Sequence, residues 1–302
     1  MAARYHFRIG IPVFGTAHQQ PVADAALELD SALVRRWLVA FLSDEIQRKR
    51  GIKGAIIGLS GGVDSAVVAF LCTEALGKEN VFCFSLPYKT SSHSSGEHAA
   101  LVVKQLGVMR ETIDISPMVD GYVEELEGEI DQHRVGNVCA RCRMTVLFDQ
   151  SAKLGALPVG TGNKTERCFG YFTWHGDDAP PINPLGDLYK TQVIALAREL
   201  GVPEVIIQKP PTADLVPGQS DETDLGVTYD IADRILIRSL RGQTVRQIET
   251  DGFSAADVRL VRDKVAGTHW KRHLPTVAML SDTSINDYYL RPVDYRGVKK
   301  PQ

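Results

Sequence analysis

The feature that most constrains the fold of this chain is a glycine-rich turn. The turn reads Ser60-Gly61-Gly62-Val63-Asp64-Ser65. It follows a short apolar run over residues 55–59 and precedes a second apolar run over residues 66–76, which stops at Gly77. This order predicts a buried strand, a tight turn and then a helix.

Such a turn is suited to hold an anion. It places free backbone N–H groups and small hydroxyls at a helix N-terminus, where the helix dipole favours negative charge, and phosphate is the natural candidate. The turn is not a Walker A loop, because it has no lysine of its own. Asp64 would repel phosphate unless a cation lay between them, so the turn implies Mg²⁺. The alternative is an ordinary strand–helix connection.

Composition is consistent with a soluble cytoplasmic enzyme. The chain has 302 residues, 44% of them hydrophobic, and a formal net charge of −3. Nothing in this balance indicates binding to nucleic acid or to a membrane surface. We find neither a secretory signal nor an apolar run of about 20 residues that could span a membrane. The five cysteines are odd in number, and we interpret Cys72 and Cys83 as reduced core thiols.

Strand-like and helix-like segments alternate along the chain. Strands are expected over residues 55–59, 81–86, 111–115 and 156–159, with helices over residues 66–76, 96–106, 138–154 and 189–200. An earlier helix, capped by Asp30 and Ser31 and ending at Gly51, carries its apolar residues on one face. These are Leu33, Val34, Trp37, Leu38, Phe41, Leu42 and Ile46. Residues 209–219 are expected to form a loop, and residues 229–267 are helical with a break at Gly252.

This alternation predicts an α/β fold, with a parallel β-sheet covered by helices on both faces in a Rossmann-like arrangement. We divide the chain into an N-terminal arm (1–28), one catalytic domain (29–280) and a C-terminal tail (281–302). Ligands bind at the carboxyl ends of the strands in such folds. The turn at residues 60–65 falls at such an end.

A second polar turn follows the strand expected at residues 156–159. It reads Gly160-Thr161-Gly162-Asn163-Lys164-Thr165-Glu166. Because it also follows a strand, it should face the same crevice as the first turn. Glu166 offers a second carboxylate for the cation that Asp64 requires, and Thr161 could hydrogen-bond a nucleotide. The alternative interpretation is a polar helix cap with a glutamate in the first turn.

Several motifs together carry a resemblance to a known family. The first turn resembles the pyrophosphate loop of N-type ATP pyrophosphatases, and the ordered set of motifs is similar to NAD synthetase, in its ammonia-dependent, single-domain form. The further motifs are Gly136-Asn137-Val138-Cys139-Ala140-Arg141-Cys142-Arg143-Met144, Gly170-Tyr171-Phe172-Thr173, Gly176-Asp177, Asn183-Pro184-Leu185, Tyr189-Lys190-Thr191-Gln192-Val193, Lys209-Pro210-Pro211-Thr212-Ala213-Asp214-Leu215, Gln219, Asp221-Glu222, Leu225-Gly226 and Lys271-Arg272. The resemblance extends from about residue 30 to residue 280, and implies the adenine nucleotide alpha hydrolase-like fold.

The resemblance implies a ligase that forms a C–N bond in two steps. The nicotinate carboxylate of deamido-NAD attacks the α-phosphorus of ATP, which gives an acyl-adenylate and pyrophosphate. Ammonia then attacks the activated carbonyl, giving NAD and AMP. Catalysis of such a reaction consists mainly of charge neutralisation and alignment. The family also implies a homodimer.

The resemblance also assigns roles to residues. Asp64, Glu166 and Lys190 would be catalytic, with Asp64 and Glu166 holding Mg²⁺. The implied ATP-binding residues are Ser60, Gly61, Gly62, Val63, Asp64, Ser65, Thr161, Lys190 and Thr212. The implied deamido-NAD-binding residues are Asn137, Arg141, Phe148, Trp174 and Lys271.

Three positions depart from the pattern of the better-known bacterial members. Trp174 stands where a lysine often contacts deamido-NAD, Pro181 stands where an acidic contact is usual, and Trp270 replaces a histidine. All three belong to the dinucleotide side of the site. They leave ATP activation in place and put the details of acceptor recognition in question.

Three other functions were weighed. A tRNA-thiolating relative could use a cysteine pair such as Cys139 and Cys142, but two cysteines supply only half of a structural zinc site. A GMP-synthetase-like ligase would change the acceptor, which the motif at residues 136–144 argues against. A non-catalytic nucleotide-binding module would not need the paired carboxylates of Asp64 and Glu166.

The nitrogen source is predicted from length. Glutamine-using members of the family carry an additional N-terminal hydrolase-type domain with a catalytic cysteine. Only about 30 residues precede the first expected helix, and no cysteine precedes Cys72. We therefore expect free ammonia as the donor, with a separate glutaminase partner left open.

Overall fold

The computed structural model describes residues 27–212, 220–273 and 276–280. Nearly all of the expected N-terminal arm (1–28), the expected C-terminal tail (281–302) and residues 213–219 of the expected loop lie outside the described residues.

A four-stranded parallel sheet forms the centre of the fold, in the order β3-β2-β1-β4. Its strands are β1 (Gly54–Gly58), β2 (Val81–Ser85), β3 (Met109–Thr112) and β4 (Ala156–Pro158). In register, Ala55 of β1 pairs with Val81 of β2 on one side and with Leu157 of β4 on the other. The expected parallel sheet is therefore confirmed.

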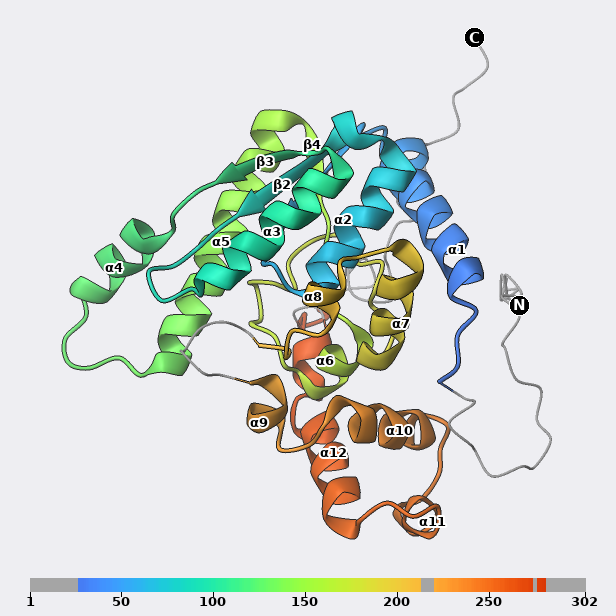
Figure 1. Cartoon of the computed structure of the whole chain (residues 1–302). Helices are drawn as coiled ribbons and strands as arrows, with labels where there is room; N and C mark the ends of the chain where they lie inside the picture. Colours follow the sequence, from blue (N-terminus) through green and yellow to red (C-terminus); the bar gives the residue numbers. More distant parts are fainter. Residues whose placement is uncertain (1–26, 213–219, 274–275, 281–302) are drawn as a thin grey trace.

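Helices cover both faces of the sheet, as expected (Figure 1). Ala55 and Ile57 point into the larger core, whereas the intervening Ile56 points into the core on the opposite face, which is the period-two alternation of a strand. The larger core packs against α1 (Ser31–Ser43), α2 (Val63–Leu76), α3 (His93–Leu106) and α7 (Lys190–Leu200). The opposite core packs against α4 (Ser116–Glu124) and α5 (Gln132–Leu154).

The C-terminal part forms a separate helical cluster with its own apolar core. It contains α6 (Lys164–Phe169), α10 (Tyr229–Leu240), α11 (Val245–Thr250) and α12 (Ala255–Gly267). Figure 1 shows α10, α11 and α12 gathered away from the sheet, with α6 and α7 between them and the rest of the fold. The break expected at Gly252 is confirmed, and a second break separates α10 from α11.

The remaining described elements are short. They are a π-helical turn at Asp44–Lys49 that continues α1, the 3₁₀ turns Lys78–Asn80 and His269–Arg272, and the helices α8 (Glu204–Ile207) and α9 (Asp221–Leu225). No helix in the described part of the chain has the length and apolar character needed to cross a membrane.

Helix caps explain where element boundaries differ from the sequence prediction. The Asp30 carboxylate accepts from the Leu33 N–H, which confirms the expected cap of α1. Helix α3 begins three residues earlier than expected, because the Ser92 hydroxyl accepts from the Ser95 N–H. Helix α5 begins six residues earlier, because Asp131 caps it in the same way.

The apolar face of α1 is only partly covered by the rest of the fold. Leu42 is buried, but Trp37 and Phe41 are 54% and 37% exposed. A helix face predicted from apolar residues alone is broader than the stripe that the neighbouring helices α2 and α7 can cover.

The cysteine prediction agrees with the structure. Cys72 and Cys83 are fully buried and unbonded. Burial raises the pKa of the Cys83 thiol to about 12, and that of the Cys72 thiol further still. Both therefore stay protonated, as structural core thiols do.

Candidate active site

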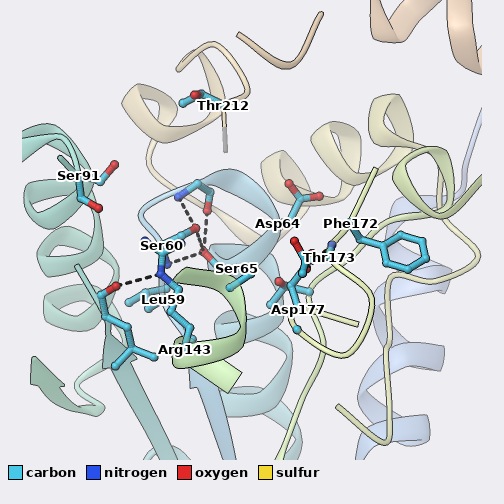
Figure 2. Close-up of a pocket in the computed structure, with 18 of the residues that line it drawn as sticks. Leu59, Ser60, Asp64, Ser65, Ser91, Arg143, Phe172, Thr173, Asp177 and Thr212 are labelled. Carbon is cyan, nitrogen blue, oxygen red and sulfur yellow. Dashed lines mark hydrogen bonds between the residues drawn. The ribbon is translucent and has the colours of Figure 1, made fainter. Parts of the chain in front are cut away.

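The glycine-rich turn adopts the strand–turn–helix geometry predicted from its sequence. Gly62 is the N-cap of α2, and its side-chain-free backbone leaves the N-terminus of the helix open. The hydroxyls of Ser60 and Ser65 lie 3.1 Å apart, and Ser65 Oγ donates to the Gly62 carbonyl at 3.1 Å. Figure 2 shows these bonds as dashed lines at the base of the turn.

Both the backbone conformation at position 61 and the close packing around it require a glycine. Its φ is +79°, in the region that favours glycine. A Cβ at this position would lie 2.2 Å from the carbonyl oxygen of Ser95 in α3. The turn is therefore pressed against α3, and no larger residue fits without a backbone shift.

A cavity of about 1490 Å³ extends from the glycine-rich turn to the helical cluster. Its walls combine both predicted turns, α5 and the segment that leads to Thr212. Among the predicted site residues it is lined by Ser60, Gly62, Val63, Asp64, Ser65, Asn137, Phe148, Thr161, Glu166, Lys190, Thr212 and Lys271. One cavity of this size can hold both a nucleotide and a second substrate.

Asp64, Glu166 and Lys190 meet beside the turn. The Lys190 ammonium, which is 3% exposed, donates a short hydrogen bond to Asp64 and lies 3.6 Å from Glu166 Oε1. The three residues come from the first turns of α2, α6 and α7. The sequence thus predicted a triad that the fold does bring together, although its chain segments are up to 126 residues apart.

Burial and charge shift the pKa values of this cluster. Burial raises the pKa of Glu166 to about 8; the Lys190 ammonium works against that rise, while the negative charges of Asp64 and Asp221 add to it. Burial alone would lower the pKa of Lys190, but the carboxylates of Asp64 and Glu166 outweigh it and raise the pKa above its usual value. Lys190 is therefore held charged between its two partners.

The second turn forms a helix cap and also brings Glu166 to the cavity. The Asn163 side chain accepts from the Glu166 N–H at 3.0 Å, and Glu166 Oε2 accepts from the Asn163 N–H at 3.3 Å, which together form a capping box. The other oxygen of Glu166 faces Lys190. The helix cap fixes the glutamate, and thereby presents it to the cavity.

The charges at this point suit a divalent cation. Asp64, Glu166 and the buried Asp221 all interact with the single ammonium of Lys190, so the ionised cluster carries excess negative charge. Two carboxylates beside a phosphate-binding turn are the usual donors for Mg²⁺. Among the described residues, no group of three or more His, Cys, Asp or Glu side chains is arranged to hold a metal alone. The residues fit a cation shared with a substrate phosphate.

Three of the predicted acceptor residues, Asn137, Phe148 and Lys271, also line the cavity. Phe148 on α5 is 39% exposed, and Asn137 accepts from the Thr173 hydroxyl at 2.8 Å. Lys271 donates to the Gly170 carbonyl at 2.6 Å and to the Phe172 carbonyl. Burial lowers the pKa of Lys271, although Asp177 and Asp178 act against the shift.

Two predicted acceptor residues do not line the cavity. Arg141 is exposed and donates to the Trp174 carbonyl at 3.2 Å, so it supports the loop that holds Trp174. Trp174 stacks on His175 at 4.4 Å and meets Trp270 edge to face at 5.2 Å. Two of the three unusual positions therefore contact each other, and Pro181 lies outside this contact.

Three residues that contribute to the site were not predicted. Asn163 donates to Asp64 at 3.0 Å. Asp221 is 5% exposed and accepts from the hydroxyls of Tyr171 and Tyr229. Asp233 is fully buried beneath the helix ends that carry Glu166 and Lys190. The Asn163-x-x-Glu166 spacing was a usable signal for Asn163, and the Asp221-Glu222 motif of the family resemblance was one for Asp221. Asp233 lies in an amphipathic helix, where a polar residue looks solvent-facing by sequence.

The cysteine pair shows no sign of a metal site. Cys139 is buried and Cys142 is half-buried, and neither forms a disulfide. Burial raises the pKa of both thiols, so they are not poised as thiolates. The structure favours a packing role for both residues on α5.

Comparison with known proteins gives a consistent result. A family model described as NAD synthase matches residues 34–275. An NH₃-dependent NAD⁺ synthetase from Trichlorobacter lovleyi is 48% identical over 262 residues, which cover 86% of this chain and 95% of the relative. A protein of the same name from Chlorobaculum parvum is 46% identical over 84% of this chain and 92% of its own.

Solved structures agree with this match. The NMN synthetase from Francisella tularensis superposes with a TM-score of 0.75 at 31% identity, over 83% of this chain and 99% of that one. The NH₃-dependent NAD synthetase from Campylobacter jejuni superposes with a TM-score of 0.72 at 29% identity, over 83% of this chain and all of that one. The sheet and the helices around it therefore have the fold of these enzymes.

Proposed function

The chain belongs to the NAD synthase family, and from this premise we propose that it works as an NH₃-dependent NAD⁺ synthetase that activates its acceptor as an acyl-adenylate. The observation that carries the proposal is the meeting of Asp64, Glu166 and Lys190 beside the glycine-rich turn, in one cavity with Asn137 and Lys271. The match to the NAD synthase family favours this function over the GMP-synthetase-like and tRNA-thiolating alternatives.

The first step is the attack of the nicotinate carboxylate of deamido-NAD on the α-phosphorus of ATP. The new O–P bond forms as the bond to pyrophosphate breaks. The turn at residues 60–65 holds the phosphates through Ser60, Gly62 and Ser65, and Lys190 contributes positive charge as negative charge develops on the leaving group. Thr161 and Thr212, which line the same cavity, contact the nucleotide. Thr212 is labelled in Figure 2.

Asp64 and Glu166 would hold Mg²⁺, which when bound neutralises phosphate charge and orients the pyrophosphate as a leaving group. Hydrogen bonds within the protein hold these two carboxylates in place. Asp64 is held by Asn163, and Glu166 is held by the capping box at the start of α6. The buried ammonium of Lys190 keeps the two carboxylates together before substrate binds.

The second step is the attack of ammonia on the activated carbonyl, which breaks the C–O bond and releases AMP. The acceptor is held by Asn137, Phe148 and Lys271, while Arg141 and Trp174 shape the loop at its edge. We further propose that the enzyme acts in the cytoplasm as a homodimer, on free ammonia, with no nucleic-acid partner. Light scattering of the purified protein measures the dimer directly.

The test of the proposed function is a product assay. ATP and MgCl₂ are supplied with deamido-NAD or nicotinate mononucleotide, and with ammonium or glutamine as the nitrogen source. We expect NAD and AMP in equal amounts, with deamido-NAD and ammonium as the preferred pair. A preference for the mononucleotide would place the enzyme with the NMN synthetase, and formation of ADP would contradict adenylation.

A further inference from the structure

Asp233 of α10 is a fully buried carboxylate, with an exposed fraction of 0%, that lies outside the cavity. Its Oδ1 accepts from the Thr165 hydroxyl at 2.5 Å. Its Oδ2 accepts from both the N–H and the hydroxyl of Thr191, at 2.9 Å and 2.8 Å. One carboxylate thus receives three hydrogen bonds from two helices.

Both of these partners are neighbours of the residues assigned to catalysis. Thr165 precedes Glu166 in α6, and Thr191 follows Lys190 in α7. The Thr165 hydroxyl also accepts from the Lys190 N–H at 3.0 Å. Asp233, Thr165 and the first turn of α7 therefore form one buried network that joins the two helix ends.

We propose that Asp233 is a positioning residue, which fixes Glu166 and Lys190 relative to each other and so ties the C-terminal helical cluster to ATP activation. This inference rests on the function proposed above. Asp233 touches neither the cavity nor the reacting groups, and acts only through Thr165 and Thr191.

A carboxylate is suited to this place because all of its partners are donors. The first N–H groups of α7 lack partners within the helix, and the helix dipole there favours a negative charge. Burial raises the pKa of Asp233 to about 6, while its hydrogen bonds to Thr165 and Thr191 and the charge of Lys190 lower it. The group is therefore ionised at neutral pH, when all three hydrogen bonds can form. An asparagine keeps the shape but turns an NH₂ group toward donors.

The test compares Asp233→Asn with a control variant, Asp251→Asn, whose ion-pair partner lies on the same helix as Asp233. Asp251→Asn breaks the ion pair between Asp251 and the buried Arg238 of α10, where the two side chains lie 3.0 Å apart, away from the site. We expect Asp233→Asn to lower kcat about 100-fold, because small displacements of catalytic groups have effects of this size. The KM for deamido-NAD should change by less than about twofold, since the acceptor end is untouched. Asp251→Asn should lower the melting temperature but leave kcat within about twofold.

A kcat of folded Asp233→Asn within about threefold of the parent, or an equal loss of kcat in Asp251→Asn, would overturn the proposal. If Asp233→Asn does not fold, Thr165→Val and Thr191→Val remove single hydroxyls from the same network. Each of these variants should lower kcat about tenfold. The double variant should lower kcat by less than the product of the two single losses, because both hydroxyls act through the one carboxylate of Asp233. Unchanged kcat in both would equally overturn it.

Failure of this inference is distinguishable from failure of the proposed function. Lys190→Ala and Glu166→Gln test the assigned roles directly. Full activity in these two variants would contradict the proposed function. Their inactivity together with a normal Asp233→Asn enzyme would contradict only the positioning role.

Discussion

The two ends of the cavity are built differently. At the ATP end, Asp64, Glu166 and Lys190 are buried or nearly so, and further hydrogen bonds from Asn163 hold the two carboxylates. Among the side chains on the acceptor side, Phe148 is 39% exposed, and Trp270, which contacts Trp174 outside the cavity lining, is 54% exposed. On the proposed function, this contrast means that the activating residues are held in place before substrate binds, whereas the acceptor is contacted by more exposed side chains.

The largest expected effect is at Asp64, which in the proposed function would hold the cation beside the glycine-rich turn. Asp64→Asn should lower turnover about 1000-fold, because it removes a charge that acts on the transition state. Initial rates of NAD formation measure this. The matched control is Asp187→Asn, which breaks the ion pair of the exposed Asp187 with Lys164 and should keep full activity. A normal rate in Asp64→Asn would show that the metal site lies elsewhere.

The second effect concerns the rigidity of the turn. Gly61→Ala should lower the free energy of unfolding by about 3 kcal/mol, because φ is +79° and the new Cβ would meet Ser95. Gly62→Ala is the control, since Gly62 has φ −92° and meets only the Ser60 hydroxyl, at 3.4 Å. Denaturant titration of both variants gives the comparison. Equal losses would mean that the contact with α3 does not restrain the turn.

The third effect follows from the pKa of Glu166, which is about 8 in the fold against 4.5 for a free side chain. Between these values the unfolded chain loses the proton first, so the stability of the metal-free protein falls as pH rises. Glu166→Gln has no such titration, so its free energy of unfolding should rise relative to that of the parent by about 2 kcal/mol between pH 5 and pH 8. The full linkage value would be larger, but the side chain of Glu166 is 18% exposed, and solvent reduces the effect.

Urea unfolding in a chelator at both pH values measures this gain. A difference between Glu166→Gln and the parent that does not change with pH would show that Glu166 is ionised throughout. The carboxylate of Glu166 would then be held in place beside Lys190 without any rise in its pKa.

The smallest effect is expected at the acceptor rim. Trp174→Ala removes the contacts with His175 and Trp270, and should raise the KM for deamido-NAD about three- to fivefold with kcat within about twofold. Trp37→Ala, an exposed tryptophan on α1, is the control and should change neither constant. A larger loss in kcat than in affinity would mean that the rim takes part in activation.

The parts of the site with a local sequence signal could be predicted. The turns at residues 60–65 and 160–166 each combine strand, turn and helix signals within a few residues, and both follow a strand and precede a helix as expected. Residues whose contact partners are distant in the sequence could not be predicted. Asp233 meets Thr165 across 68 positions, and an aspartate in an amphipathic helix looks solvent-facing until the packing of α10 is known.

The same limit applies to α1. Trp37 and Phe41 satisfy the helical period as well as Leu42 does, and only the packing of α1 against α2 and α7 decides which of them is covered. Amino-acid pattern predicts which side of a helix is apolar. It does not predict how much of that side its neighbours can reach.

The central claim is that the acceptor carboxylate is activated through bonding to the α-phosphorus of ATP. It is tested most directly with deamido-NAD that carries ¹⁸O in the nicotinate carboxylate. An acyl-adenylate transfers one of these oxygens to phosphorus, so the account predicts one ¹⁸O atom in each AMP formed, measured by mass spectrometry. Label in inorganic phosphate, or AMP without label, would contradict the account.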